Sequence, residues 1–258
     1  MNVFATHVRA PVQSGLQSAG RYVLLLYDAF GAPWRELRRY QADLFEQMMR
    51  LGVASLPIVM LASAFTGGVM TVQTVYQMRS PLIPPSTVGA IVGPSMILEL
   101  TALVTAFILA GRVGARVAAE LASMRVTEQI DALEVMGLSP EAYLVAPRVA
   151  AGALMFPLLY VAACAVGVGA GVAAAALSDA VTVADFLEGA RTYFRVFDVA
   201  YGLLKALVFG FAITSVACYK GFHARSGAQE VGASATRAAV GGCVFVLATD
   251  LLLAATLL

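Results

Sequence analysis

The segment Glu120–Arg148, with the sequence ELASMRVTEQIDALEVMGLSPEAYLVAPR, gathers charged residues between two long apolar runs. A helix of about 20 mostly apolar residues spans the hydrocarbon layer of a membrane. The segment therefore predicts a place where the chain leaves the membrane between two spans. It is also a candidate contact for a partner, because connecting segments often carry function.

The composition of the whole chain is typical of an integral membrane protein. Of its 258 residues, 60% are hydrophobic and 13% are charged, and the mean hydropathy is +0.81. Soluble domains carry about 25% charged residues. The formal net charge of +1 argues against binding to nucleic acid. The two histidines, His7 and His223, are too isolated in the sequence to indicate a metal site.

Five apolar segments are long enough to cross a membrane as helices. We therefore predict an all-α integral membrane protein with five transmembrane helices. Three of the spans each contain one ionisable residue, namely Glu99, Lys205 and Asp250. The predicted spans are Leu51–Met78, Thr87–Ala110, Val149–Leu177, Val199–Tyr219 and Ala238–Leu258.

The region before the first span is predicted to hold an amphipathic helix that lies in the membrane interface. Its apolar and aromatic face recurs at steps of three and four residues, opposite a basic face. A helix packed against the bundle is the alternative. We thus divide the chain into an N-terminal cytoplasmic or interfacial region, 1–50, and a five-span domain, 51–258, with its cytoplasmic segment at 112–148. The apolar and aromatic face of the predicted interfacial helix consists of Trp34, Leu37, Tyr40, Leu44 and Met48.

Basic residues predict the orientation, because cytoplasmic flanks carry an excess of Lys and Arg. With the N-terminus inside, only Arg79, Arg191 and Arg195 of the 17 basic residues are external, and Lys205 lies in the membrane. The other basic residues are cytoplasmic. Since the number of spans is odd, the C-terminus is expected outside.

Capping signals in the charged segment predict two short helices. Thr127 is expected to cap the first helix, with Glu128 in its first turn and Gly137 as its left-handed stop. Ser139 is expected to cap the second helix, which has Pro140 at its first position.

The first of these helices is predicted to be amphipathic. Its stripe consists of Val126, Ile130, Leu133 and Met136, and its acidic side consists of Glu128, Asp131 and Glu134. Such a helix is either a solvated connector or a docking element for a soluble partner. The chain lacks the GxxxxGK[ST] phosphate loop, so any ATP hydrolysis is expected in a separate subunit, and we predict a transport subunit rather than an enzyme.

The run ELASMRVTEQIDALEVMGLSPEAYLVAPRVAAG resembles the signature of the MlaE family, the permease subunits of ABC transporters that move lipids between bacterial membranes. The resemblance includes ELTALVTAFILAGRVGARVAAEL upstream and GAQEVGASATRAAV downstream, and it covers roughly Ser86–Leu258. One departure is in the second span. Many members have Arg-Glu-Leu-Gly where this chain has Leu98-Glu99-Leu100-Thr101, so headgroup contacts of that arginine do not carry over.

The resemblance implies a homodimeric permease of the bacterial inner membrane, with a cytoplasmic N-terminus and a periplasmic C-terminus. Its expected partners are a cytoplasmic ABC ATPase that binds ATP and Mg²⁺, a periplasmic MCE-domain carrier, and a small STAS-domain subunit. The cargo is then phospholipid, in a system that maintains outer-membrane lipid asymmetry, or a sterol-like or other hydrophobic compound. The chain itself is expected to need no cofactor.

The resemblance also assigns the helix at Thr127–Met136 as the coupling helix that enters a groove of the ATPase. Its expected contacts are Thr127, Glu128, Ile130, Asp131, Leu133, Glu134 and Met136. On this basis Ile130→Asp is expected to abolish ATPase association and transport while leaving membrane insertion intact.

Ionisable groups inside a membrane cost at least about 2.5 kcal/mol to insert, so they normally face a partner or a wet cavity. Lys205 is expected to pair with Asp250 or Glu99, to snorkel outward, or to line a cavity where it attracts a lipid phosphate. The resemblance implies that Glu99 and Lys205 bind substrate and that Asp250 is structural. An ion relay through the three residues, in a secondary transporter, is the rival interpretation.

Overall fold

The computed structural model describes residues 3–31, 41–78, 84–178, 181–225 and 227–257, without the side chains of 3–16 and 41. The regular structure in these ranges is helical. Five helical segments are long and apolar enough to cross a membrane: Ala42–Gln77, Ser86–Val126, Glu141–Leu177, Val196–Phe222 and Ala228–Leu257. The prediction of an all-α protein with five spans is therefore confirmed.

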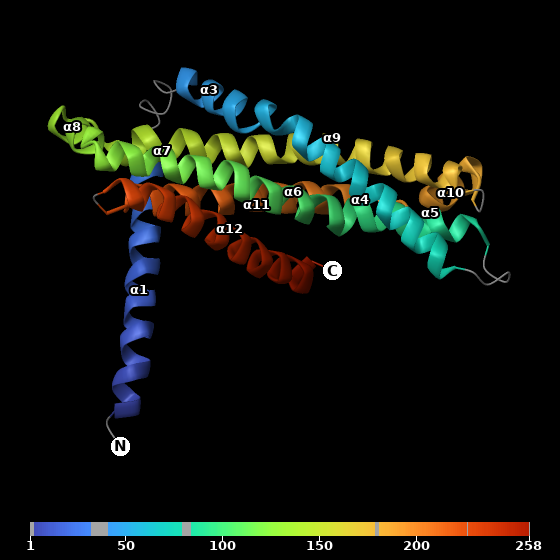
Figure 1. The fold of residues 1–258 in the computed structure, drawn as a ribbon, viewed down its shortest axis with the longest axis horizontal. Coiled ribbons are helices and arrows are strands. Elements are labelled where there is room, and N and C mark those ends of the chain that lie inside the picture. Colours follow the sequence, from blue (N-terminus) through green and yellow to red (C-terminus); the bar gives the residue numbers. More distant parts are fainter. Residues whose placement is uncertain (1–2, 32–40, 79–83, 179–180, 226, 258) are drawn as a thin grey trace.

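The helices form an elongated bundle with one helix, α1 (Val3–Phe30), at right angles to it (Figure 1). The first span joins α3 (Gln41–Leu51) to α4 (Leu56–Gln77) through a short turn at Val53–Ser55. The second span is a rod of α5 (Ser86–Ser95), η2 (Met96–Leu100), α6 (Thr101–Leu109), η3 (Ala110–Gly114) and α7 (Ala115–Val126). After α8 (Gln129–Val135), the chain continues as η4 (Glu141–Val145), α9 (Ala146–Leu177), α10 (Val183–Thr192), α11 (Val196–Phe222) and α12 (Ala228–Leu257).

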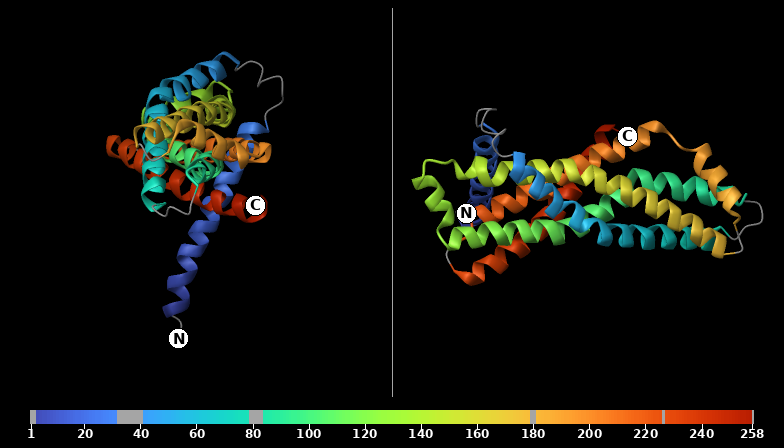
Figure 2. Two further views of the ribbon diagram at one scale, coloured as in Figure 1. Left: turned by 90° about the vertical axis from the view of Figure 1, so that its right-hand side faces the viewer. Right: turned by 90° about the horizontal axis from the view of Figure 1, so that it is seen from above.

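The long helix α9 packs against both α4 and α11, and α11 also contacts α7 and α12. At the end of the bundle opposite α8, the short helices α5 and α10 pack together (Figures 1 and 2). The buried side chains of α11 include Lys205, whose neighbours are therefore set by these helix contacts.

Small residues let α4 and α9 approach closely. Ser63, Gly67 and Thr71 recur every four residues on α4, and they meet an equally spaced row of small residues on α9. A Cβ atom added to Gly67 would lie 1.9 Å from the carbonyl oxygen of Gly167. The hydroxyl of Ser63 donates a hydrogen bond to the carbonyl oxygen of Ala163, at 2.6 Å. Such contacts provide packing where lipid supplies no hydrophobic drive between helices.

This contact predicts different effects for two neighbouring glycines. Gly67→Ala is expected to lower stability by about 1 to 3 kcal/mol, because the new methyl group would collide with backbone that cannot move freely. Gly68→Ala is the matched control, since its added Cβ would meet no atom within 4 Å. Thermal unfolding of both purified variants in detergent checks this; equal melting temperatures would contradict the close contact.

The N-terminal region differs from the prediction in its arrangement. Trp34, Leu37 and Tyr40 lie outside the described residues. Leu44 and Met48 pack against the core, which fits the alternative of a packing helix. The helix at right angles to the bundle is α1, which was not among the predicted elements.

The expected cap of the first short helix is wrong in its geometry. The Thr127 hydroxyl donates a hydrogen bond to the carbonyl oxygen of Ser123, at 2.9 Å, and so closes the end of α7. Glu128 precedes α8 with a positive φ of 58°. The second span thus runs on to Val126, and a tight left-handed residue then turns the chain into α8.

The expected stop at Gly137 is confirmed. Its φ is +77°, the N–H of Leu138 donates to the carbonyl oxygen of Leu133 at 3.1 Å, and the N–H of Gly137 donates to that of Glu134 at 2.9 Å. These two bonds define a Schellman motif. The helix that starts at Pro140 continues without a break into α9, so it is the beginning of the third span rather than a separate short helix.

Candidate functional site

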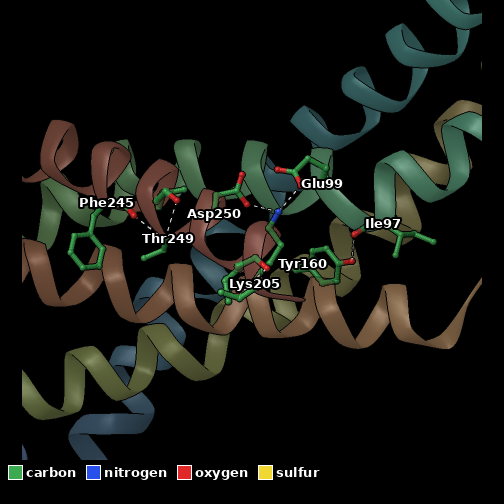
Figure 3. A network of polar contacts seen from close by, with 10 residues as sticks. Ile97, Glu99, Tyr160, Lys205, Phe245, Thr249 and Asp250 are labelled. Carbon is green, nitrogen blue, oxygen red and sulfur yellow. Dashed lines mark hydrogen bonds and ion pairs between the residues drawn. The ribbon is translucent and has the colours of Figure 1, made fainter. Parts of the chain in front are cut away.

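The three ionisable residues inside the spans meet at one point of the bundle (Figure 3). The Nζ atom of Lys205 on α11 lies 2.6 Å from Oε2 of Glu99 and also forms an ion pair with Oδ1 of Asp250 on α12. The Lys205 side chain is fully buried, whereas those of Glu99 and Asp250 are 40% and 16% exposed. Two carboxyl groups thus share one ammonium group, and Glu99 is the more exposed of the two.

The position of Glu99 follows from an irregularity in its helix. Pro94 lacks a backbone N–H and so disturbs the hydrogen bonds of an α-helix. The next turn, η2, is a π-helix in which the N–H of Thr101 donates to the carbonyl oxygen of Met96. Such wide turns are frequent at functional sites. Here the wide turn carries Glu99, and Pro94 is the feature of the sequence that signals it.

Neighbouring aromatic residues complete the surroundings of the ion pair. Tyr201 and Phe209 lie one turn before and after Lys205 on α11, and their ring centroids are 5.3 and 5.8 Å from its Nζ atom. The hydroxyl of Tyr160 on α9 donates a 2.6 Å hydrogen bond to the carbonyl oxygen of Ile97 (Figure 3). This bond ties the wide turn to α9 and holds it in place.

The geometry matches the internal pairing that the sequence analysis left open. Both carboxylates already contact the Lys205 ammonium group, and the side chain is fully buried. The Lys205 ammonium group is thus engaged within the chain, and its contact with a lipid phosphate stays a prediction. Glu99 stays a candidate contact for substrate, and Asp250 links α12 to α11.

A second candidate surface lies at the far end of the bundle, on α8 and the residue after it. The side chains of Val135 and Met136 are 89% and 65% exposed, and Leu138 is 38% exposed. Glu128, Asp131 and Glu134 are exposed as well. We call Val135 and Met136, with these three acidic residues, the α8 face. The sequence pattern predicts Met136 and the acidic residues at this surface, but not Val135.

Two of the residues expected to contact the ATPase face the core of the bundle instead. Ile130 is fully buried, and Leu133 is partly buried against the same core. Burial assigns Ile130 to holding α8 on the bundle, so it offers no surface to a partner. An Ile130→Asp variant would disturb the chain itself, and it does not isolate docking from folding.

Ion pairs connect α8 and the start of the third span to α7. Arg125 on α7 donates to Oδ1 of Asp131 on α8, at 2.7 Å. Arg148, nearly buried at the start of α9, lies 3.0 Å from Oε1 of Glu120 on α7 and donates to the carbonyl oxygen of Leu144 at 2.7 Å. α8 is thus attached to the end of the second span, and the start of the third span is attached to that same helix α7.

A five-span helical bundle, with a charged site inside the spans and an exposed helix at one polar end, fits the class of multi-span membrane permeases. The family model described as Permease MlaE matches residues 44–256, so the chain belongs to the MlaE permease family.

Three relatives cover most of this chain. It is 33% identical over 237 residues to a probable ABC transporter permease protein of Rickettsia typhi, with 92% of this chain and 91% of the relative covered. It is 30% identical over 241 residues to the intermembrane phospholipid transport system permease protein MlaE of Haemophilus influenzae, with 93% and 91% covered. It is 34% identical over 211 residues to the chloroplastic protein trigalactosyldiacylglycerol 1 of Arabidopsis thaliana, with 81% and 59% covered.

Proposed function

We propose that this chain is the permease subunit of an ABC transporter that moves phospholipid between the inner membrane and a periplasmic MCE-domain carrier, and so maintains outer-membrane lipid asymmetry. The observation that carries the proposal is the α8 face, where Val135 and Met136 expose apolar side chains beside three carboxylates. Methionine is enriched at protein–protein interfaces, whose apolar centres are surrounded by polar residues. Membership of the MlaE permease family supports an ATPase as the partner.

The attachment of α8 provides a route from the ATPase to the lipid. In the proposed cycle, closure of two ATP-binding subunits moves the α8 faces of two permease copies. The displacement enters the second span directly, because Ser86–Val126 is one helical segment that ends just before α8. The same segment carries Glu99. Movement of α8 therefore reaches the wide turn through one rod.

Glu99 is the proposed contact for cargo in an outward cavity between the two copies. Its carboxylate is held by Lys205 and yet partly exposed, so it can accept hydrogen bonds from hydroxyl or ammonium groups of a lipid headgroup. Lys205 acts as a positioning residue. A sterol-like cargo with one hydroxyl group would use the same acceptor.

The cargo is tested with the purified complex of wild-type chain and ATPase. Mass spectrometry of the retained lipids is expected to find phospholipid, and Glu99→Gln is expected to lower its amount several-fold while the melting temperature stays within about 2 °C, because the residue is partly exposed. Retention of a sterol-like or other hydrophobic compound in place of phospholipid would contradict phospholipid as the cargo and identify that compound instead. Unchanged retention in Glu99→Gln would contradict the role of this residue.

A secondary transporter is the second candidate, favoured by the two carboxyl groups that share the Lys205 ammonium group inside the spans. In that case a proton gradient, without nucleotide, would move the cargo in proteoliposomes that contain the chain alone. We expect no movement of cargo under this condition. Lys205 is fully buried and pairs with both carboxyl groups, so its ammonium group is not placed to exchange protons with water.

A further inference from the structure

Residues of α1, α11 and α12 and of the loop between the last two line a polar pocket. These helices meet at the end of the bundle that also carries α8 (Figure 1). Its volume is about 480 Å³. Lys220, which lines it, is 15 residues beyond Lys205 on α11, or about 22 Å along a helix. The pocket is thus separate from the site inside the spans. Its lining consists of Ser18, Arg21, Tyr219, Lys220, His223, Arg225, Glu230 and Arg237.

Positive charge exceeds negative charge in this pocket. Four of the lining side chains are Arg or Lys, and Glu230 is the one carboxylate among them. Arg237 is already engaged, because it forms an ion pair with Glu230 and donates to the Ser234 hydroxyl at 3.2 Å. Arg21, Lys220 and Arg225 remain as a positive surplus that no lining carboxylate balances.

The side chain of His223 lies in the positive electrostatic environment of this pocket. Partial burial lowers the pKa of His223 below its ordinary value, the positive charges of Arg21 and Arg125 lower it further, and the negative charge of Glu141 offsets part of this effect. The carbonyl oxygen of Tyr219, 3.1 Å from Nδ1, acts in the opposite direction. An anion in the pocket would offset the unfavourable positive potential at this ring.

The walls of the pocket are held by aromatic contacts. The Tyr22 hydroxyl on α1 forms a 2.7 Å hydrogen bond with the Ser215 hydroxyl on α11. The Tyr22 and Tyr219 rings meet edge to face with centroids 5.7 Å apart, and the Tyr219 and His223 centroids are 4.6 Å apart. These contacts fix α1 against α11, so Arg21 is brought to the basic residues at the end of α11.

The helix α1 also places the pocket at the level of lipid headgroups. It lies at right angles to the bundle, which is the direction of a helix in the membrane plane (Figure 1). Val23, Leu24 and Tyr27 on α1 are 61%, 59% and 73% exposed, and they provide apolar surface for acyl chains next to Arg21. Basic pockets between helices at the cytoplasmic side are suited to anionic headgroups.

We propose that this pocket binds a phosphate oxyanion, supplied by an anionic phospholipid of the cytoplasmic leaflet or by free phosphate. Arg21, Lys220 and Arg225 provide the charge-assisted hydrogen bonds, and Ser18 and His223 lie at the same wall. The site goes beyond the proposed transport function. An occupied pocket would join α1 to the ends of α11 and α12 without entering the transport route.

The test uses the full chain in nanodiscs of phosphatidylcholine with a minor fraction of phosphatidylglycerol. Native mass spectrometry is expected to detect retained phosphatidylglycerol, and Lys220→Gln/Arg225→Gln is expected to lower it about 10- to 30-fold, since each basic side chain near an anionic surface strengthens binding severalfold. Arg50→Gln/Arg116→Gln is the matched control, because it removes equal charge outside the pocket, and it should retain the lipid. Lys220→Arg/Arg225→Lys keeps both charges and should also retain it.

Free phosphate is tested in nanodiscs of phosphatidylcholine alone. Broadening of the ³¹P signal of inorganic phosphate by wild-type chain, lost in Lys220→Gln/Arg225→Gln, would support the pocket with free phosphate as the source. Selective loss of phosphatidylglycerol would support it with lipid as the source. The proposal is overturned if neither ligand responds to the pocket substitutions, or if Arg50→Gln/Arg116→Gln reduces binding equally. Circular dichroism of each variant confirms that the fold is kept.

Discussion

Lys205→Met is expected to lower the stability of the chain by about 3 to 5 kcal/mol, which is typical when one partner of a buried ion pair is removed. Methionine keeps the length of the side chain but leaves Glu99 and Asp250 facing each other without the cation between them. Like-charge repulsion between the two carboxyl groups, or the uptake of a proton that relieves it, would then weaken the contact of α12 with the second span. Thermal unfolding in detergent measures this effect as a lower melting temperature.

A double variant separates charge from packing. Lys205→Met/Asp250→Asn removes the cation together with one carboxylate, so it is expected to recover a large part of the lost stability. The difference from additivity gives the coupling between the two residues. If Lys205→Met were as stable as wild type, or if the two substitutions were simply additive, the ion pair would not hold these helices together.

The second large effect is expected at the α8 face. Val135→Asp/Met136→Asp places carboxylates on the two most exposed apolar side chains of this surface, next to existing acidic groups. Central contact residues commonly contribute 2 kcal/mol or more, so the affinity for the ATPase is expected to fall by at least about 30-fold. Co-purification with the ATPase and its bound fraction in a titration measure the change.

The conservative variant Val135→Leu/Met136→Leu serves as the control, because it keeps the surface apolar. It is expected to bind the ATPase normally, and both variants should insert into the membrane and unfold at the wild-type temperature. Normal co-purification of Val135→Asp/Met136→Asp with the ATPase would show that the α8 face does not bind it. Ile130→Asp is not suited to this test, since its buried position makes loss of folding the expected result.

The spans could be predicted because apolar length is a local property of the sequence. The stop at Gly137 could be predicted for a similar reason, since a left-handed residue is most easily supplied by glycine. The cap at Thr127 was wrong because α7 is longer than its apolar part, and a hydroxyl can close one helix as well as open the next. Local signals therefore predicted the five spans but not all of their ends, since the second span runs on to Val126 and the helix from Pro140 belongs to the third span.

The remaining errors concern which neighbour a residue meets. The stripe of Ile130 and Leu133 showed an apolar face, but periodicity does not distinguish the core of the same chain from a partner. The pairing of Lys205 stayed open because the rotation of each helix in the bundle is set by packing. The basic pocket combines Arg21 with residues near 220 and 237, and this proximity exists only after α1 docks on α11.

The most direct test of the account is ATP-dependent lipid transfer in proteoliposomes that contain the chain, its ATPase and an MCE-domain acceptor. Fluorescent phospholipid is followed as it moves between the membrane and the acceptor, with and without ATP. We predict transfer by the wild-type complex that requires ATP and is lost in Val135→Asp/Met136→Asp. Transfer by the chain alone under a proton gradient, or unchanged transfer in this variant, would contradict an ATP-driven permease coupled through α8.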